Sequence, residues 1–138
     1  MALRRRESCV WSGIESDSVK ALFDTNILID YLNGVAAARR ELDLYDSCAI
    51  SIVTWMEVMC GGELDLADTT RGFLNRFALI RIDQVIAGRA VVLRRERHLK
   101  LPDAIILATS FETGLMLVTR NTKDFGGQLP GIRIPYRV

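Results

Sequence analysis

The chain has 138 residues, of which 49% are hydrophobic and 25% are charged, which fits one globular domain with its own core. Its longest apolar run, residues 104–108, is far shorter than the roughly 20 residues that span a bilayer, so we expect no membrane segment and a cytoplasmic protein. The net charge of +1 excludes a strongly basic chain but neither supports nor excludes an RNA substrate, since an acidic site can cancel a basic surface.

The cysteine pattern excludes two further classes of protein. There are three cysteines, Cys9, Cys48 and Cys60, and an odd count without close pairs argues against a disulfide framework. No CxxC or Cys/His spacing indicates a zinc site. We therefore expect free thiols in a reducing compartment.

The first half of the chain begins with polar residues 1–18, which lack periodicity and predict a flexible extension ahead of a single domain over residues 19–138. A strand is predicted over residues 19–23. A helix follows over residues 25–32, where apolar residues recur on one face, and Asn33–Gly34 ends it. The next predicted elements are a helix over 36–44, a strand over 48–51, a helix over 54–60 and a helix over 65–77.

The second half continues the alternation of strands and helices. A strand is predicted over 78–82, and Asp83 caps a long helix that reaches about residue 98. Pro102 suits the first turn of a helix that ends before Gly114. Strands over 115–118 and 132–134 follow. This pattern predicts an α/β fold, a three-layer α/β/α sandwich with a parallel sheet of four or five strands.

Acidic and polar side chains follow the predicted strands at the points where such sheets bind ligands. Asp24 follows the first strand, and Glu57 lies in the helix after the second. Asp103 opens the helix that begins at Pro102. Three polar residues follow the strand over 115–118: Thr119, Asn121 and Asp124. We expect at least three of these four segments to meet at one edge of the sheet.

A divalent cation would explain such a cluster. Neighbouring carboxylates repel one another and resist full ionisation, and a bound cation removes that penalty. Hard oxygen ligands select Mg²⁺ or Mn²⁺ rather than zinc. The bound metal can activate a water and neutralise charge on a phosphate. With one histidine and no cysteine placed as a nucleophile, a metal is the most economical catalyst.

Each acid also has a purely structural interpretation. Asp24 can cap the helix that starts at Thr25. Glu57 can be a solvated helix residue or can face an apolar surface. Asp103 lies in a helix first turn, where an acid favours the macrodipole.

Basic residues lie close to these acids in the sequence. Arg120 and Lys123 flank the fourth segment and are predicted to bind phosphate. A basic run before Asp103 is either a solvated helix end or a phosphate-binding rim; it consists of Arg94, Arg95, Arg97 and Lys100.

Four segments of the chain resemble the motifs of PIN domains, in particular those of VapC-type toxins. They are residues 22–30 (LFDTNILID), 51–58 (SIVTWMEV), 101–109 (LPDAIILAT) and 117–125 (LVTRNTKDF). The resemblance covers about residues 21–134, with the motifs in the family's order. It implies a metal-dependent endoribonuclease that hydrolyses RNA phosphodiester bonds.

The resemblance also implies roles for single residues. Asp24 and Asp103 would be the principal metal ligands, and Glu57 would complete the cluster directly or through a water. Asn121 stands where many members carry a fourth acid; it can ligate but adds no charge, and Asp124 would supply that charge. This departure leaves open whether one or two metals bind. Three supporting side chains would orient the ligands: Thr25, Asn26 and Thr119.

Partners and rival functions follow from the same resemblance. It implies a toxin that a cognate antitoxin protein holds inactive, and a homodimer. One rival is a non-cleaving PIN-like module that binds RNA or protein, and the presence of Asp24, Glu57 and Asp103 argues against it. A second rival is a receiver-type domain with an aspartyl-phosphate, but no acidic pair stands beside Asp24 and Lys123 is a weak candidate for the lysine it needs.

Overall fold

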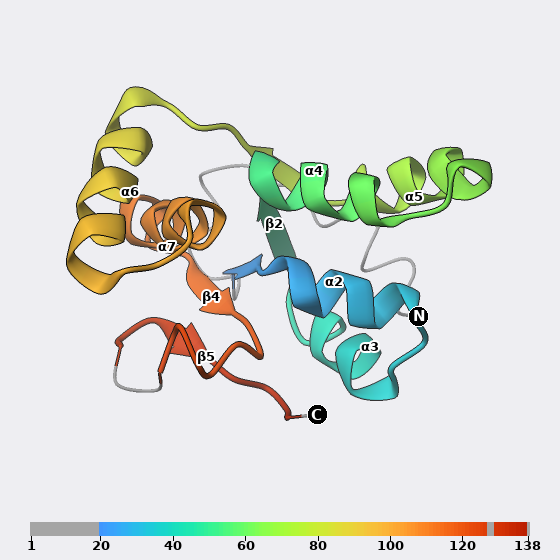
Figure 1. The fold of residues 1–138 in the computed structure, drawn as a ribbon. Coiled ribbons are helices and arrows are strands. Elements are labelled where there is room, and N and C mark those ends of the chain that lie inside the picture. The colour runs from blue at the N-terminus through green and yellow to red at the C-terminus, as the bar shows by residue number, and fades with distance from the viewer. Residues whose placement is uncertain (1–19, 127–128, 138) are drawn as a thin grey trace.

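The computed structural model describes residues 20–126 and 129–137, and Figure 1 shows strands interleaved with helices. The extension predicted over residues 1–18 lies outside the described residues. The strands are β1 (Lys20–Phe23), β2 (Ser47–Ser51), β3 (Ala78–Ile80), β4 (Met116–Val118) and β5 (Ile132–Arg133). The helices are α2 (Thr25–Leu32), α3 (Ala36–Leu42), α4 (Ile52–Gly61), α5 (Ala67–Leu74), α6 (Gln84–Arg97), α7 (Leu101–Thr113) and the short 3-10 helix η1 (Leu64–Leu66).

The strands form one 5-stranded sheet in the order β3-β2-β1-β4-β5, and every pair is parallel. Strand β1 is central, with Leu22 paired to Ala49 of β2 on one side and to Leu117 of β4 on the other. Since all strands are parallel, they end at the same edge. The predicted parallel sheet is confirmed, with the larger of the two expected strand counts.

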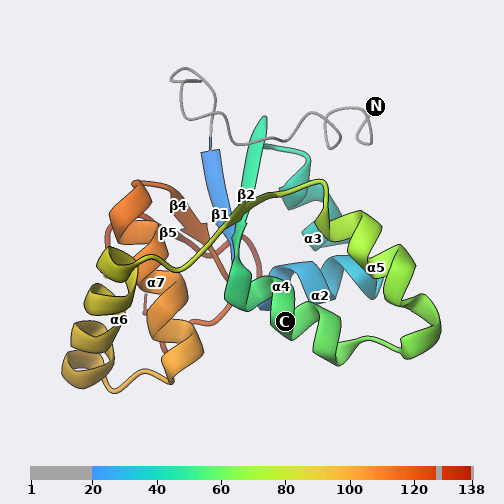
Figure 2. The same cartoon turned by 90° about the horizontal axis from the view of Figure 1, so that it is seen from above.

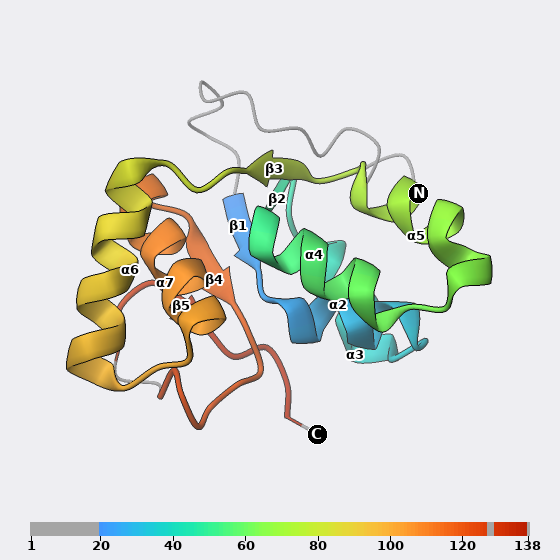
Figure 3. The same ribbon diagram turned by 45° about the horizontal axis from the view of Figure 1, so that its top comes forward.

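Alternate residues of each strand face opposite layers of helices, as the period of a strand requires. In β1, Ala21 and Phe23 pack in a core with residues of α2, α3 and α5. Leu22, between them, packs in a second core with residues of α6 and α7. Figure 2 and Figure 3 show these two groups of helices on opposite sides of the sheet. The predicted three-layer sandwich is therefore confirmed.

Some helix boundaries differ from the predicted ones. Helix α4 begins at Ile52, earlier than predicted, because the Ser51 hydroxyl caps it by accepting a 3.0 Å hydrogen bond from the Val53 amide. The helix predicted over 65–77 is two elements, η1 and α5, separated where Leu66 leaves the helical region at φ −104° and ψ 10°. In residues 20–126 and 129–137, no helix is long and apolar enough to cross a bilayer.

A buried carboxylate on α3 anchors the last strand. Arg133 of β5 donates two hydrogen bonds to Glu41, from Nε at 2.6 Å and from a terminal nitrogen at 3.0 Å. Tyr45 donates a third to the same carboxylate at 2.5 Å. Burial and the bond to Glu41 raise the pKa of Tyr45 well above its usual range. These contacts tie the edge strand to the helical layer on one face.

Candidate active site

Asp24 directly follows β1, the central strand, at the carboxyl edge of the sheet. It therefore lies between the ends of β2 and β4. Its amide donates to the Val118 carbonyl at 2.9 Å, which continues the β1–β4 ladder. The carboxylate is only 4% exposed. Its Oδ1 accepts from the Thr25 amide at 2.7 Å, and its Oδ2 accepts from the Thr119 hydroxyl at 2.7 Å.

Burial raises the pKa of Asp24, and the negative charge of Glu57 raises it further. The hydrogen bonds from Thr119, Thr25 and Asn26 lower the pKa again in part. Asp24 also acts as the N-cap of α2, so the capping interpretation is correct without excluding a second role. A buried carboxylate with a raised pKa and a fixed orientation is a strong candidate for a cation ligand.

Asp103 lies in the first turn of α7 and shares an electrostatic environment with the other acids. Burial, followed by the charges of Asp24, Asp124 and Glu57, raises the pKa of Asp103 to about 6. Hydrogen bonds link three of the four segments at this edge, since Thr119 contacts Asp24 and Thr25 contacts Glu57. This agrees with the expectation that at least three of the segments meet, and Asp103 is related to them through charge.

Glu57 projects from α4 toward the start of α2. Its Oε1 accepts a 2.6 Å hydrogen bond from the Thr25 hydroxyl, which also lies 3.2 Å from the Thr54 hydroxyl. Glu57 is exposed but held by this contact, so it is not simply a solvated helix residue. The Thr25 hydroxyl thus contacts Glu57, and a supporting role for Thr25 stays a prediction.

Asn121 and Asp124 form a reciprocal pair in the loop after β4. The Asn121 amide nitrogen Nδ2 donates to Asp124 Oδ2 at 3.0 Å, and the Asp124 backbone amide donates to Asn121 Oδ1 at 3.1 Å. The Asn121 backbone amide donates to the Thr119 hydroxyl at 3.0 Å. The two candidates for the fourth position are therefore linked, and Asp124 contributes the negative charge that Asn121 lacks.

Asn26 connects the acidic cluster to the loop after β4. Its Nδ2 lies 3.2 Å from Asp24 Oδ2 and 3.3 Å from the Thr119 hydroxyl. Its Oδ1 accepts from the Arg120 backbone amide at 3.3 Å. Asn26 and Thr119 thus brace one oxygen of Asp24 from two directions.

The donor set matches a hard divalent cation in its chemistry. Within residues 20–126 and 129–137, no group of three or more Asp, Glu, His or Cys side chains is already arranged to hold a metal ion. However, Asp24 and Asp103 carry carboxylates whose ionised forms burial and like charge disfavour. A cation between them would reverse both effects, with waters completing its surroundings.

The two predicted phosphate-binding residues differ in their contacts. Lys123 is exposed beside the site. Arg120 instead donates to the buried Asp30, from Nε at 2.6 Å and from a terminal nitrogen at 3.1 Å. Its guanidinium is therefore already engaged, and its contacts give no support to a phosphate-binding role.

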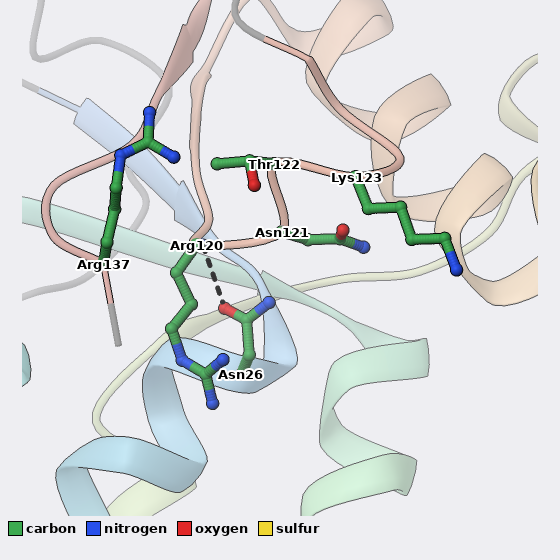
Figure 4. A pocket seen from close by; sticks show the side chains of 6 residues that line it. All are labelled: Asn26, Arg120, Asn121, Thr122, Lys123 and Arg137. Atoms are coloured by element: carbon green, nitrogen blue, oxygen red, sulfur yellow. Dashed lines mark hydrogen bonds between the residues drawn. The ribbon is translucent and has the colours of Figure 1, made fainter.

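A cavity of about 420 Å³ adjoins the acidic site, and its lining includes a residue that the sequence did not reveal. Figure 4 shows Arg137, from the end of the described chain, on the same cavity as Lys123. No motif contains Arg137, so no sequence signal could have found it. Asp30 lies within the first motif, but its partner Arg120 is 90 positions away.

Residues 21–126 match the family model of the PIN domain. The chain belongs to the PIN domain family. A comparison with curated proteins gave no match. The family match confirms the resemblance that the motifs indicated.

Solved structures agree with this assignment. A chain of a toxin–antitoxin complex from Klebsiella pneumoniae is 52% identical, with a TM-score of 0.81, over 86% of this chain and 99% of that one. A chain of DNA-bound VapBC from Salmonella typhimurium is 28% identical, with a TM-score of 0.69, over 84% and 96%. FitAcB from Neisseria gonorrhoeae, at 19% identity and a TM-score of 0.71 over 86% and 99%, shares the fold. The chain is thus a PIN domain that resembles chains of toxin–antitoxin complexes.

Proposed function

We propose that this protein is an endoribonuclease that hydrolyses RNA phosphodiester bonds with Mg²⁺ or Mn²⁺, and that it is the toxin of a toxin–antitoxin pair. The observation that carries the proposal is the contact geometry at the carboxyl edge of the sheet, where Thr119 holds Asp24 and Thr25 holds Glu57. The raised pKa of Asp103, next to further carboxylates, agrees with it. This cluster stands at the ligand-binding edge of a parallel sheet. It occurs in a PIN domain similar to a chain of a toxin–antitoxin complex.

Each acid has a distinct role in this proposal. Asp24 and Asp103 hold the cation, and Glu57 and Asn121 complete its surroundings. When bound, the cation supplies an activated water and neutralises charge that develops on the phosphate. Asp124 adds negative charge through its pair with Asn121.

The supporting residues fix these ligands before substrate arrives. Thr119 and Asn26 hold Oδ2 of Asp24 and leave Oδ1 to the Thr25 amide. The Thr25 hydroxyl fixes Glu57. Preorganised ligands reduce the reorganisation that the reaction would otherwise require.

Cleavage of a labelled structured RNA tests the proposal directly. The wild type would be assayed with Mg²⁺, with Mn²⁺ and with EDTA, beside Asp24→Asn and the control Asp68→Asn. Asp68 is fully exposed on α5, with its carboxylate on Arg71. We expect metal-dependent cutting by the wild type and the control, and none by Asp24→Asn. RNA binding without cutting would instead indicate the non-cleaving module.

An apolar groove supports the antitoxin part of the proposal. A cavity of about 380 Å³ between α2, α4 and α5 is lined partly by apolar side chains, Leu32 and Leu66 among them. These two residues are 41% and 52% exposed, and an apolar segment of a partner protein would remove them from water. We propose that the antitoxin covers this groove.

The antitoxin of the Klebsiella pneumoniae complex is a suitable probe, given the 52% identity of the toxin-like chain. Leu66→Glu should weaken its binding at least tenfold. Val85→Glu is the matched control, because Val85 is 62% exposed on α6. Equal binding by both variants would contradict the groove assignment.

We also propose that the protein forms a homodimer, as the family resemblance implies. Sedimentation of the wild type alone would test this.

A further inference from the structure

Among the residues that the structure describes, the cavity beside the acidic site is lined by cationic, amide and hydroxyl side chains and by no carboxylate. Its lining consists of Asn26, Arg120, Asn121, Thr122, Lys123 and Arg137 (Figure 4). Asn26 contacts Asp24 and Asn121 contacts Asp124, so the cavity borders the acidic site directly. A hollow with these donors fits an anion, and its position fits an anion that reaches the acidic site at the same time.

Three cations among the described residues line this cavity, and two of them have no carboxylate partner among those residues. Arg120 is paired with Asp30. Lys123 and Arg137 are exposed, and neither forms an ion pair within the part of the chain that the structure describes. These two side chains are therefore available to a phosphate, for which a guanidinium is well suited.

A buried cluster anchors the segment that carries Arg137. Tyr136 donates its hydroxyl to Asp30 Oδ2 at 2.8 Å, and Arg120 donates to both oxygens of the same carboxylate. Burial opposes the ionised form of Asp30, but these hydrogen bonds outweigh it and lower its pKa. The Asp30 carboxylate is thus charged and fixed on α2, and it places Tyr136 and its neighbour Arg137 against the cavity.

We infer that Lys123 and Arg137, at the two ends of the cavity (Figure 4), bind phosphates of the RNA strand next to the bond that is cut, and that the Asp30–Arg120–Tyr136 cluster positions Arg137. This inference rests on the proposed function. The acidic edge repels a polyanion, and neighbouring phosphates held by these two cations offset that repulsion and fix the register of the strand. Arg137 takes the role that the sequence assigned to Arg120, and Arg120 becomes a positioning residue.

The test is binding of a labelled single-stranded RNA to the Asp24→Asn protein, which separates binding from cleavage. Adding Arg137→Ala should weaken binding about three- to tenfold and reduce the slope of log K against log salt by about 0.7, the value for one phosphate contact. Adding Arg81→Ala should change neither the affinity nor the salt slope. Arg81 is also an exposed arginine, but it follows β3, the outer strand on the far side of the sheet from β5. Arg137→Lys should recover part of the affinity.

Tyr136→Phe tests the positioning cluster, because it removes only the hydroxyl that reaches Asp30. We expect weaker RNA binding with little change in the melting temperature, a split that a purely structural role would not give. If Asp24→Asn binds RNA and Arg137→Ala in that background binds it equally well, the inference fails while the proposed function stands. If the wild type neither binds nor cleaves RNA, the proposed function fails as well.

Discussion

The Thr119 hydroxyl donates a 2.7 Å hydrogen bond to Oδ2 of Asp24, although the two residues are 95 positions apart. Each residue directly follows a strand, Thr119 after β4 and Asp24 after β1, and these strands are neighbours. Both side chains are buried. The contact therefore exists because two parallel strands end together, and it fixes the carboxylate that we propose as a metal ligand.

Thr119→Val should reduce RNA cleavage about 10- to 100-fold, as is typical when a group that orients a metal ligand is lost. The isosteric valine removes the hydroxyl and leaves Asp24 with a higher pKa, so the lost activity should recover partly as the pH rises. Thr119→Ser keeps the hydroxyl and serves as the control. A valine variant as active as the serine variant would show that the contact has no role in cleavage.

The pH dependence of stability provides a second prediction. Folding raises the pKa of Asp103 from 3.8 to about 6, so the native state binds this proton more tightly than the unfolded state. Protonation of Asp103 therefore stabilises the native state fully below about pH 4. The free energy of unfolding should fall by about 2 kcal/mol as the pH rises to about 6. Urea unfolding of the metal-free protein in EDTA would measure it.

Asp103→Asn is the reference for this measurement, because it cannot ionise. The stability difference between wild type and Asp103→Asn should fall with rising pH between about 4 and 6. Adding Mg²⁺ at neutral pH should stabilise the wild type and leave Asp103→Asn nearly unchanged. A stability difference that is constant over this range would mean that Asp103 is not in the environment described.

A third prediction concerns the buried Asp30. Arg120→Met should lower the free energy of unfolding by about 3 kcal/mol, because a buried carboxylate would lose its cation. The cost should shrink at low pH, where a protonated Asp30 needs no cation. Lys123→Met, at an exposed position, should change the free energy of unfolding by less than about 0.5 kcal/mol. Equal losses of stability for Arg120→Met and Lys123→Met in chemical denaturation would contradict a stabilising contact between Arg120 and Asp30.

His98 provides a fourth prediction, since it ends α6 in the left-handed region at φ 60° and ψ 33°. Side chains disfavour this conformation and glycine does not, so His98→Gly should raise the free energy of unfolding by about 0.5–1 kcal/mol. Gly114 ends α7 in the same region at φ 76°, and Gly114→Ala should lower stability by a similar amount. Thermal unfolding would detect both changes, and a destabilised His98→Gly would disprove this account of the helix end.

Sequence patterns predicted the fold and the acidic cluster because both depend on local rules. Short apolar runs indicate the buried strands, and parallel strands bring the residues that follow them, such as Asp24 and Thr119, to one edge. The partners of Asp30 could not be predicted, because Arg120 and Tyr136 reach it from 90 and 106 positions away. Only the packed chain brings Arg137 to the cavity.

The central claim is that Asp24 and Asp103 hold a divalent cation, and a titration with Mn²⁺ followed by electron paramagnetic resonance tests it most directly. Wild type, Asp24→Asn, Asp103→Asn and the surface control Asp68→Asn would be titrated at neutral pH, with folding checked by circular dichroism. We predict that the wild type and Asp68→Asn bind Mn²⁺ and that the other two variants lose this binding while remaining folded. Equal Mn²⁺ binding by all four proteins, or none by the wild type, would contradict the claim.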